Sequence, residues 1–439
     1  METRVDDPRP LMKQLVLYGR ISEGEKLARE VKARAEAEGD KLLAAEAAHR
    51  LGECLHEGFR YEEAWRAFEE ALTGRSGELG PDHVLTAVTR AHLAAVSWSR
   101  DRGVEARALA RRAAPALAKE PQEEDRSEVA EGLKALASIE RGAGKKEEAR
   151  AMLRRTLGML EKGGGREELE IASACVALAV EEQDAHRLAA ARRLFERALE
   201  IRRGKFGEEH TYIGFCLSHL SALHIPDDFE GAKALATQAL GMLERCMGPD
   251  SPSISTVLMT LGTIAVMQEQ TEEGFAYFEK AIAIEEAFFG PNHPYLSATL
   301  SVVAMAHTGS GDVKGAEPLW RRVVDLTLPA RETRLDALVT AINNLMVSLR
   351  SEERHQEILA FAEPLIEQFE ADPTTPPEAM TALWNGAAEA HYRLKRAAKA
   401  EKLLKRAIVT AERRFGKEAE QLDPLLANLA QLLTSMGRK

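Results

Sequence analysis

The sequence predicts an all-α protein built from repeated helix pairs, and three observations support this prediction. A small residue recurs every 41 to 43 positions through most of the 439-residue chain. The composition is 45% hydrophobic but only 5% aromatic, and Ala, Leu, Arg and Glu dominate, which is typical of helices. Apolar residues also follow each small residue at helical spacing. Such a period indicates a stack of similar structural units, which can grow as one continuous body.

The recurring small residue, here called the landmark, lies on the second helix of each unit. Mostly apolar residues follow it four and seven positions later, so the three share one face of an α-helix. A second series of small residues, 12 positions before the landmark, lies on a preceding helix. Each unit is therefore expected to be two antiparallel helices in close contact. The landmarks are Ala64, Ala106, Ala149, Ala191, Ala232, Gly274, Ala316, Ile358 and Ala400.

The connectors between units follow the same period. Glycine adopts the left-handed conformation that ends a helix, and the proline that follows some of these glycines prevents the helix from continuing. One unit departs from the pattern, because Met346 and Ile358 are bulky at positions that are usually small. We therefore expect displaced packing in that unit. The connector glycines are Gly80, Gly165, Gly207, Gly248, Gly290 and Gly416.

Three segments carry a resemblance to a known family: RYEEAWRAFEEAL (60–72), HRLAAARRLFERALEI (186–201) and FFGPNHPYLSATL (288–300). They resemble tetratricopeptide repeats in the longer 42-residue form found in kinesin light chains and many bacterial proteins. The resemblance implies a right-handed α-solenoid of about ten helix-pair units, in which the first helix of each pair lines the concave face. It predicts a divergent first hairpin within 1–40, about nine units over 41–416 and a capping helix over 417–439.

Three positions per unit are expected to face the concave groove, at 15, 14 and 11 residues before the landmark, or one fewer in the Ala232 unit. In the middle units these positions are uncharged, with histidine neutral, and mildly apolar, which is unusual for a solvated helix face. Such a surface is typical of one that a partner covers. The alternative is that a narrow superhelix buries part of its own concave face. The middle positions are Val176, Val180, Ser218, His219, Met259, Thr260, Thr263, Ser301, Val302 and Met305.

Asparagines continue the groove toward the C-terminal end. An amide both donates and accepts, so it can bind a peptide backbone of any sequence, and in the family such asparagines often do so. We expect Asn344→Ala to weaken a partner by about 1–3 kcal/mol; the alternative is that they are ordinary polar residues on a helix surface. The inner positions of these units hold no cation, which argues against a clamp for a C-terminal carboxylate. The residues are Asn343, Asn344, Val347, Asn385 and Asn428.

A possible metal site lies near the N-terminal end. His49, Glu53 and His56 share one helix face, and His92 is one unit away; two histidines and a carboxylate can hold a divalent ion. However, the segment lacks the H-E-x-x-H pattern. The sequence therefore favours an ordinary polar groove entrance without metal or cofactor. No phosphate-binding loop or activated nucleophile is recognisable either, so we expect no enzymatic activity.

Composition restricts the partners further. The net charge of −11 argues against nucleic acid as the main partner. No stretch reaches the about 18–20 apolar residues of a membrane span, and the N-terminal segment lacks the basic and apolar regions of a signal peptide. We therefore expect a cytoplasmic protein with free, buried thiols. These thiols are Cys54, Cys175, Cys216 and Cys246.

The leading functional prediction is a non-catalytic scaffold or adaptor that binds a peptide or helix of another protein in its concave groove. The alternative is a regulator in which a short peptide or other ligand tightens the superhelix. X-ray scattering discriminates between them, because only the regulator compacts on binding. The sequence specifies neither the partner nor the oligomeric state.

Overall fold

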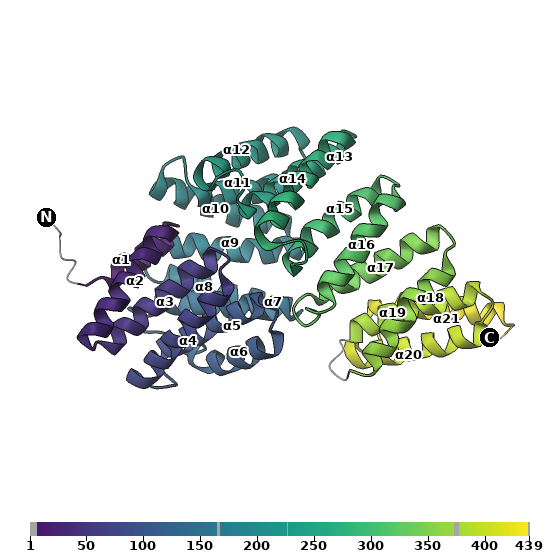
Figure 1. Cartoon of the computed structure of the whole chain (residues 1–439), viewed down its shortest axis with the longest axis horizontal. Coiled ribbons are helices and arrows are strands. Elements are labelled where there is room, and N and C mark those ends of the chain that lie inside the picture. The colour runs from purple at the N-terminus through teal and green to yellow at the C-terminus, as the bar shows by residue number, and fades with distance from the viewer. Residues whose placement is uncertain (1–6, 165–166, 226, 373–376, 438–439) are drawn as a thin grey trace. The chain divides into compact units, whose positions relative to one another are not determined.

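A computed structural model describes residues 7–164, 167–225, 227–372 and 377–437 (Figure 1). These residues form α-helices and three short 3-10 helices, labelled η, and they contain no strand. The predicted all-α repeat fold is confirmed. The elements are α1 (Arg9–Leu17), α2 (Ile21–Glu38), α3 (Lys41–Glu57), α4 (Tyr61–Glu78), α5 (Val84–Ser99), α6 (Gly103–Leu117), α7 (Arg126–Gly142), α8 (Lys146–Glu161), α9 (Glu168–Asp184), α10 (Leu188–Phe206), α11 (Thr211–His224), α12 (Phe229–Met247), η1 (Pro252–Ile254), α13 (Ser255–Met267), α14 (Thr271–Phe289), η2 (Pro294–Leu296), α15 (Ser297–Gly309), α16 (Val313–Thr327), α17 (Leu335–Ser351), α18 (His355–Glu370), α19 (Pro377–Arg393), α20 (Ala397–Phe415), η3 (Glu420–Leu422) and α21 (Asp423–Ser435).

The chain forms two compact units, residues 1–264 and residues 265–439. In both units, consecutive helices pack as pairs, for example α3 with α4 and α19 with α20, and α21 packs against α20. Among the described residues, no helix is both long and apolar enough to cross a membrane. Cys54, Cys175 and Cys216 are buried free thiols, whereas Cys246 is exposed near the end of α12, contrary to expectation.

The landmark residues lie in the core, as the helical spacing predicts. Every alanine landmark is fully buried, and the bulky Ile358 is 3% exposed. The large residues four positions later fill the space between helices, because Phe68, Phe195, Phe278 and Trp320 are also fully buried. The alternation of small and large side chains therefore forms the contact within and between helix pairs.

The connector glycines have the positive φ that the sequence predicts, but ψ is −154° at Gly207, 156° at Gly248, 154° at Gly290 and 163° at Gly416, which places these four outside the left-handed helical region. The five described members of the set have positive φ, for example +89° at Gly248 and +88° at Gly290. In both places the glycine directly follows the last residue of a helix, where a side chain would be strained. Gly165 lies outside the described residues.

In the α3–α4 pair, the second helix packs so closely on the first that only a small residue fits 12 positions before the landmark. A Cβ atom on Gly52 of α3 would lie 2.9 Å from ring atoms of Phe68 in α4. We expect Gly52→Ala to lower the free energy of unfolding by about 1–3 kcal/mol, because overpacking outweighs alanine's better helix propensity. Urea unfolding followed by circular dichroism measures this loss.

The matched control is Gly158→Ala in α8, where an added Cβ meets nothing within 4 Å. It should raise the free energy of unfolding by about 0.5–1 kcal/mol through helix propensity alone. A gain of similar size in Gly52→Ala would contradict the close-contact role of this position.

The packing changes at the unit that the bulky residues mark. Helix α18 makes more of its contact with α19 than with its own partner α17. The side chain of Met346 on α17 occupies the space beside Gly386 on α19, where an added Cβ would lie 1.8 Å from the Met346 sulfur. The predicted displacement of this unit is confirmed, and the first helices α17 and α19 contact each other directly beside it.

The first unit closes on itself. The ring of Tyr18, which follows α1, meets the ring of Phe206 in α10 at 5.4 Å between centroids. His210 Nε2, just before α11, lies 3.0 Å from the Tyr18 carbonyl oxygen, 192 residues away in sequence. A cavity of about 170 Å³ lies among these helices, and its lining comes from α1, α3, α7, α9, α10 and α11.

Candidate functional site

The predicted groove positions have different environments in the structure. Met305 and Val347 occupy the groove position eleven residues before the landmark in their units, and they are 48% and 43% exposed. His219 instead stacks on Phe195 of the preceding helix, with ring centroids 4.7 Å apart, as His92 stacks on Phe68 at 5.4 Å. Burial lowers the pKa of His219 to about 4. These histidines therefore contribute to packing between consecutive units.

Several predicted groove residues offer little to a partner. Ser218 and Met259 are only 4% and 8% exposed, which corrects their assignment to an open surface, because the inner helices of the first unit pack closely. Val176, Val180, Thr260, Thr263, Ser301 and Val302 are half-buried. The hydroxyls of Thr260, Thr263 and Ser301 donate to carbonyls four residues earlier in their own helices.

The structure brings three predicted residues together in the second unit. Asn343 and Val347 of α17 and Asn385 of α19 line a cavity of about 200 Å³. The cavity lies at the displaced unit, where α17, α18 and α19 meet. We call it the α17–α19 cavity. Its lining consists of Asn343, Met346, Val347, Arg350, His355, Ile358, Ala382, Asn385, Gly386, Glu389 and Ala390.

The asparagines differ in how much of their hydrogen-bonding capacity is used. Asn344 Nδ2 donates to the Thr340 carbonyl of its own helix at 2.9 Å. Asn428 Nδ2 donates to Asn385 Oδ1 at 2.8 Å, so the structure pairs two of the predicted residues. Within the described residues, Asn343 makes no side-chain hydrogen bond and is exposed. Asn343 and the amide nitrogen of Asn385 are therefore the groups that remain for a ligand.

Charged and polar groups complete the α17–α19 cavity. Arg350 Nη1 forms an ion pair with Glu389 Oε2 at 2.6 Å. His355 Nδ1 is buried and has no hydrogen-bond partner among the described residues. The sequence pattern did not indicate Arg350 or His355 as site residues, although bulky Met346 and Ile358 marked the unit. With neutral histidine, the lining carries no net charge.

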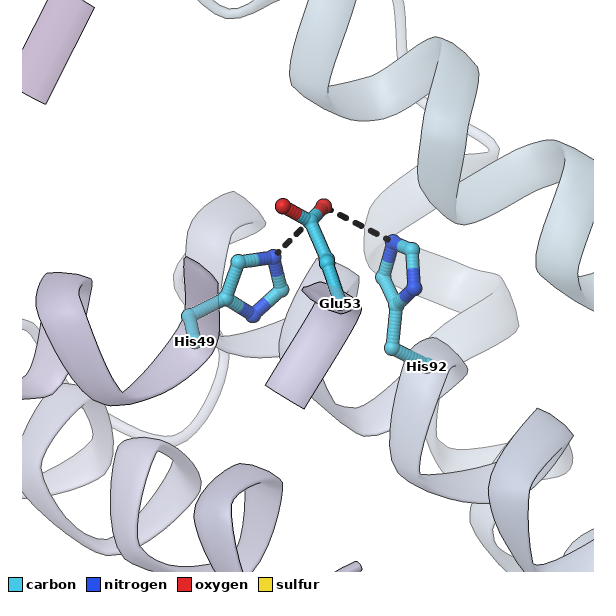
Figure 2. A group of neighbouring side chains, drawn as sticks. All are labelled: His49, Glu53 and His92. Atoms are coloured by element: carbon cyan, nitrogen blue, oxygen red, sulfur yellow. Dashed lines mark ion pairs between the residues drawn. The ribbon is translucent and has the colours of Figure 1, made fainter. Parts of the chain in front are cut away.

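A second polar cluster lies inside the first unit. His49 and Glu53 of α3 and His92 of α5 converge there, as Figure 2 shows. Glu53 Oε1 lies 3.4 Å from His49 Nε2 and 3.9 Å from His92 Nε2. His56, which the sequence grouped with them, lies outside the cluster. The cluster is mostly buried, whereas the sequence favoured an ordinary polar groove entrance.

Burial and a neighbouring cation set the charges of this cluster. Burial lowers the pKa of His49, and it lowers the pKa of His92 to about 3. Burial opposes ionisation of Glu53, but the Arg50 guanidinium holds the pKa of that carboxyl well below its usual range. The imidazoles are therefore neutral at pH 7 and the carboxylate is ionised.

Comparisons with known proteins agree with the repeat pattern. A family model of the tetratricopeptide repeat matches residues 43–119 and 253–328, and a second tetratricopeptide repeat model matches residues 171–212. A comparison with curated proteins finds no match.

One solved structure that aligns over most of the chain has the same kind of fold, and two others align over about half of the chain. A Rap protein complexed with Competence and Sporulation Factor is similar over 90% of this chain and 97% of that chain, at 13% identity and a TM-score of 0.55. BtubC (BKLC) from P. vanneervenii is similar over 54% and 90% of the two chains, at 21% identity and a TM-score of 0.38. TPR-like repeats of a putative kinesin light chain from Podosopora anserina are similar over 48% and 99%, at 20% identity and a TM-score of 0.35. Together with the helix pairs and their period, the family models identify residues 43–119, 171–212 and 253–328 as tetratricopeptide repeats.

Proposed function

We propose that this chain is a non-catalytic interaction scaffold that binds an extended peptide segment of another protein across α17 and α19. The observation that carries the proposal is the α17–α19 cavity, lined by asparagines from two consecutive first helices beside the exposed Val347. Such a role requires neither a cofactor nor a reactive side chain. Peptide binding on the inner helices is also the common role of tetratricopeptide repeats, which adds weight by analogy.

The lining indicates what the peptide offers at this point. Val347, which is 43% exposed, provides apolar surface, and the buried side chains of Met346 and Ile358 lie beside it in the lining. This surface suits one apolar side chain, and methionine adapts to different shapes. Asn343 and Asn385 can bind the backbone on either side. Because Arg350 and Glu389 neutralise each other, we expect an uncharged residue at the cavity, flanked by residues of variable sequence.

The test starts from a displayed library of random peptides selected on the immobilised full chain. The double variant Asn343→Ala, Asn385→Ala should weaken a selected peptide by about 1–3 kcal/mol, or roughly tenfold to a hundredfold, because backbone hydrogen bonds are lost. Calorimetry with one synthetic peptide measures the change.

Asn344→Ala is the matched control. Asn344 Nδ2 is already bonded within α17, so we now expect a smaller effect here than in the double variant, in contrast to the expectation from sequence alone. Equal peptide affinity of the double variant and the unchanged protein would refute the proposal. Scattering from the complex then discriminates between a scaffold of constant dimensions and a regulator that compacts.

A further inference from the structure

The cluster inside the first unit has the donor set of a transition-metal site. One donor atom from each of His49, Glu53 and His92 lies within 4.8 Å of the others. Around a tetrahedral zinc ion with bonds of about 2.0–2.2 Å, ligand atoms lie about 3.3–3.6 Å apart. The two distances to Glu53 Oε1, 3.4 Å and 3.9 Å, are close to this range. Small side-chain rotations would therefore suffice to bring all three onto one ion.

The histidine Nε2 atoms at this place lie near Glu53 but make no hydrogen bond within the described residues. His49 is 0% exposed, and neither of its nitrogens nor Nε2 of His92 has a hydrogen-bond partner among the described residues. Leaving a buried polar group unpaired costs about 1–3 kcal/mol. A bound ion would satisfy one nitrogen of each ring.

The two oxygens of Glu53 face different groups. Oε1 faces the histidines, as Figure 2 shows. Arg50 Nη1 lies closer to Oε2, at 2.9 Å, than to Oε1, at 3.2 Å. An ion on Oε1 would therefore leave the stronger bond of Arg50 in place. A hydrogen bond of this kind orients a carboxylate that binds metal and tunes its affinity.

We propose that His49, Glu53 and His92 bind a divalent transition-metal ion, and that zinc is the ion this donor set favours. The sequence motif argued against a metal because it lacks H-E-x-x-H spacing. The structure supplies what the motif does not, a second histidine from the next helix pair and unpartnered nitrogens that point toward one carboxylate oxygen. The proposal is independent of peptide binding at the α17–α19 cavity.

The cavity beside the cluster gives an ion a path to the three ligands. It also keeps one coordination position of that ion free for another ligand. Glu53 lines the cavity of about 170 Å³, together with Lys13 of α1 and Tyr212 of α11. Three protein ligands and one exchangeable ligand are a common arrangement for zinc. Carboxylates and cations already balance around the site, so the added charge of the ion favours an anionic fourth ligand. The balancing groups are Glu46, Glu53 and Glu128 with Lys13, Arg50 and Arg75.

The test uses the full chain without a polyhistidine tag, freed of metal on a chelating resin. Calorimetric titration with Zn²⁺ should give about one ion per chain, and Co²⁺ should give the visible absorption bands of a tetrahedral site. His92→Gln and Glu53→Gln should each weaken Zn²⁺ binding by about a hundredfold or more, since loss of a ligand exceeds the about 10–100-fold effect of losing an outer contact. His56→Gln, on the same helix but outside the cluster, should bind as the unchanged protein does.

Circular dichroism establishes whether each variant is folded. Absence of Zn²⁺ binding or of tetrahedral Co²⁺ bands in the unchanged protein would overturn the proposal, whatever the variants do. Unchanged Zn²⁺ affinity in folded His92→Gln would overturn it as well, and an equal loss in His56→Gln would assign the ion to other histidines.

Discussion

Replacing Arg50 with methionine should lower the free energy of unfolding by about 3–5 kcal/mol, since it removes one partner from a buried ionic network. Arg50 is 4% exposed. Its guanidinium bonds Glu53 and Glu46 of α3 and also reaches Glu128 of α7. Methionine preserves much of the side-chain volume, so the loss measures mainly the carboxylates that are left buried without their cation.

The size of this loss should depend on pH. Arg50 and Lys13, acting against burial, hold the pKa of Glu128 below its usual range, and Arg50 does the same for Glu53. A carboxyl with a lowered folded-state pKa contributes stability that is present above the unfolded pKa of about 4.3 and lost as pH falls below it. The unchanged protein therefore loses stability in acid, and the deficit of Arg50→Met should narrow between neutral pH and about pH 3.

Urea unfolding at several pH values measures both effects. Arg60→Met is the matched control, because Arg60 forms ion pairs with Glu25 and Glu63 but its side chain is 42% exposed. Such exposed pairs contribute about 0–1 kcal/mol. If Arg50→Met behaves like this control at pH 7, the network is not a stabilising contact between helices.

Trp320→Ala should produce a loss of similar size in the second unit. Trp320 is fully buried four positions after landmark Ala316, and it belongs to a core with Leu338 and Ile342 of α17. Truncating a buried aromatic side chain to alanine costs about 3–5 kcal/mol, because packing is lost and a cavity remains. Its indole nitrogen has no hydrogen-bond partner among the described residues, so no polar group loses its partner.

Hydrogen exchange resolved by peptide locates the Trp320→Ala effect. Amides of α15, α16 and α17 should lose protection more than amides of residues 1–264, because a repeat contacts mainly its neighbours. Met305→Ala is the control in the same unit; Met305 is 48% exposed, so its replacement should change stability by less than about 0.5 kcal/mol. A uniform loss of protection along the chain would contradict this local coupling.

The helix pairs were predictable because their contacts repeat. Three kinds of residue recur at one period: landmark alanines such as Ala64, the aromatic residues that follow them, and connector glycines such as Gly248. Each of them lies where local packing requires it. Met346 and Ile358 were also recognisable as departures. Their consequence, a cavity shared by α17 and α19, was not readable, because it depends on where displaced helices come to rest.

The candidate sites were predictable only in part. Asn343, Val347 and Asn385 converge as expected, but the period could not show that Asn344 bonds its own helix. It also could not reveal the burial of Arg50 and His49. Their environment depends on curvature accumulated over several units, and small rotations per repeat have no signature in residue type.

Closure of the first unit changes how that part of the chain is expected to fold. In an open array each repeat depends on its neighbours alone, so folding can begin anywhere and spread. The contact of Tyr18 with His210 spans 192 residues and can form only after the helix pairs between them have stacked. Contacts of such long range form late, because loop closure costs entropy before they stabilise anything. We therefore expect the segment after α1 to dock on α10 and α11 late in folding. Once it has docked, the first and later helix pairs of this unit stabilise each other directly and should unfold together.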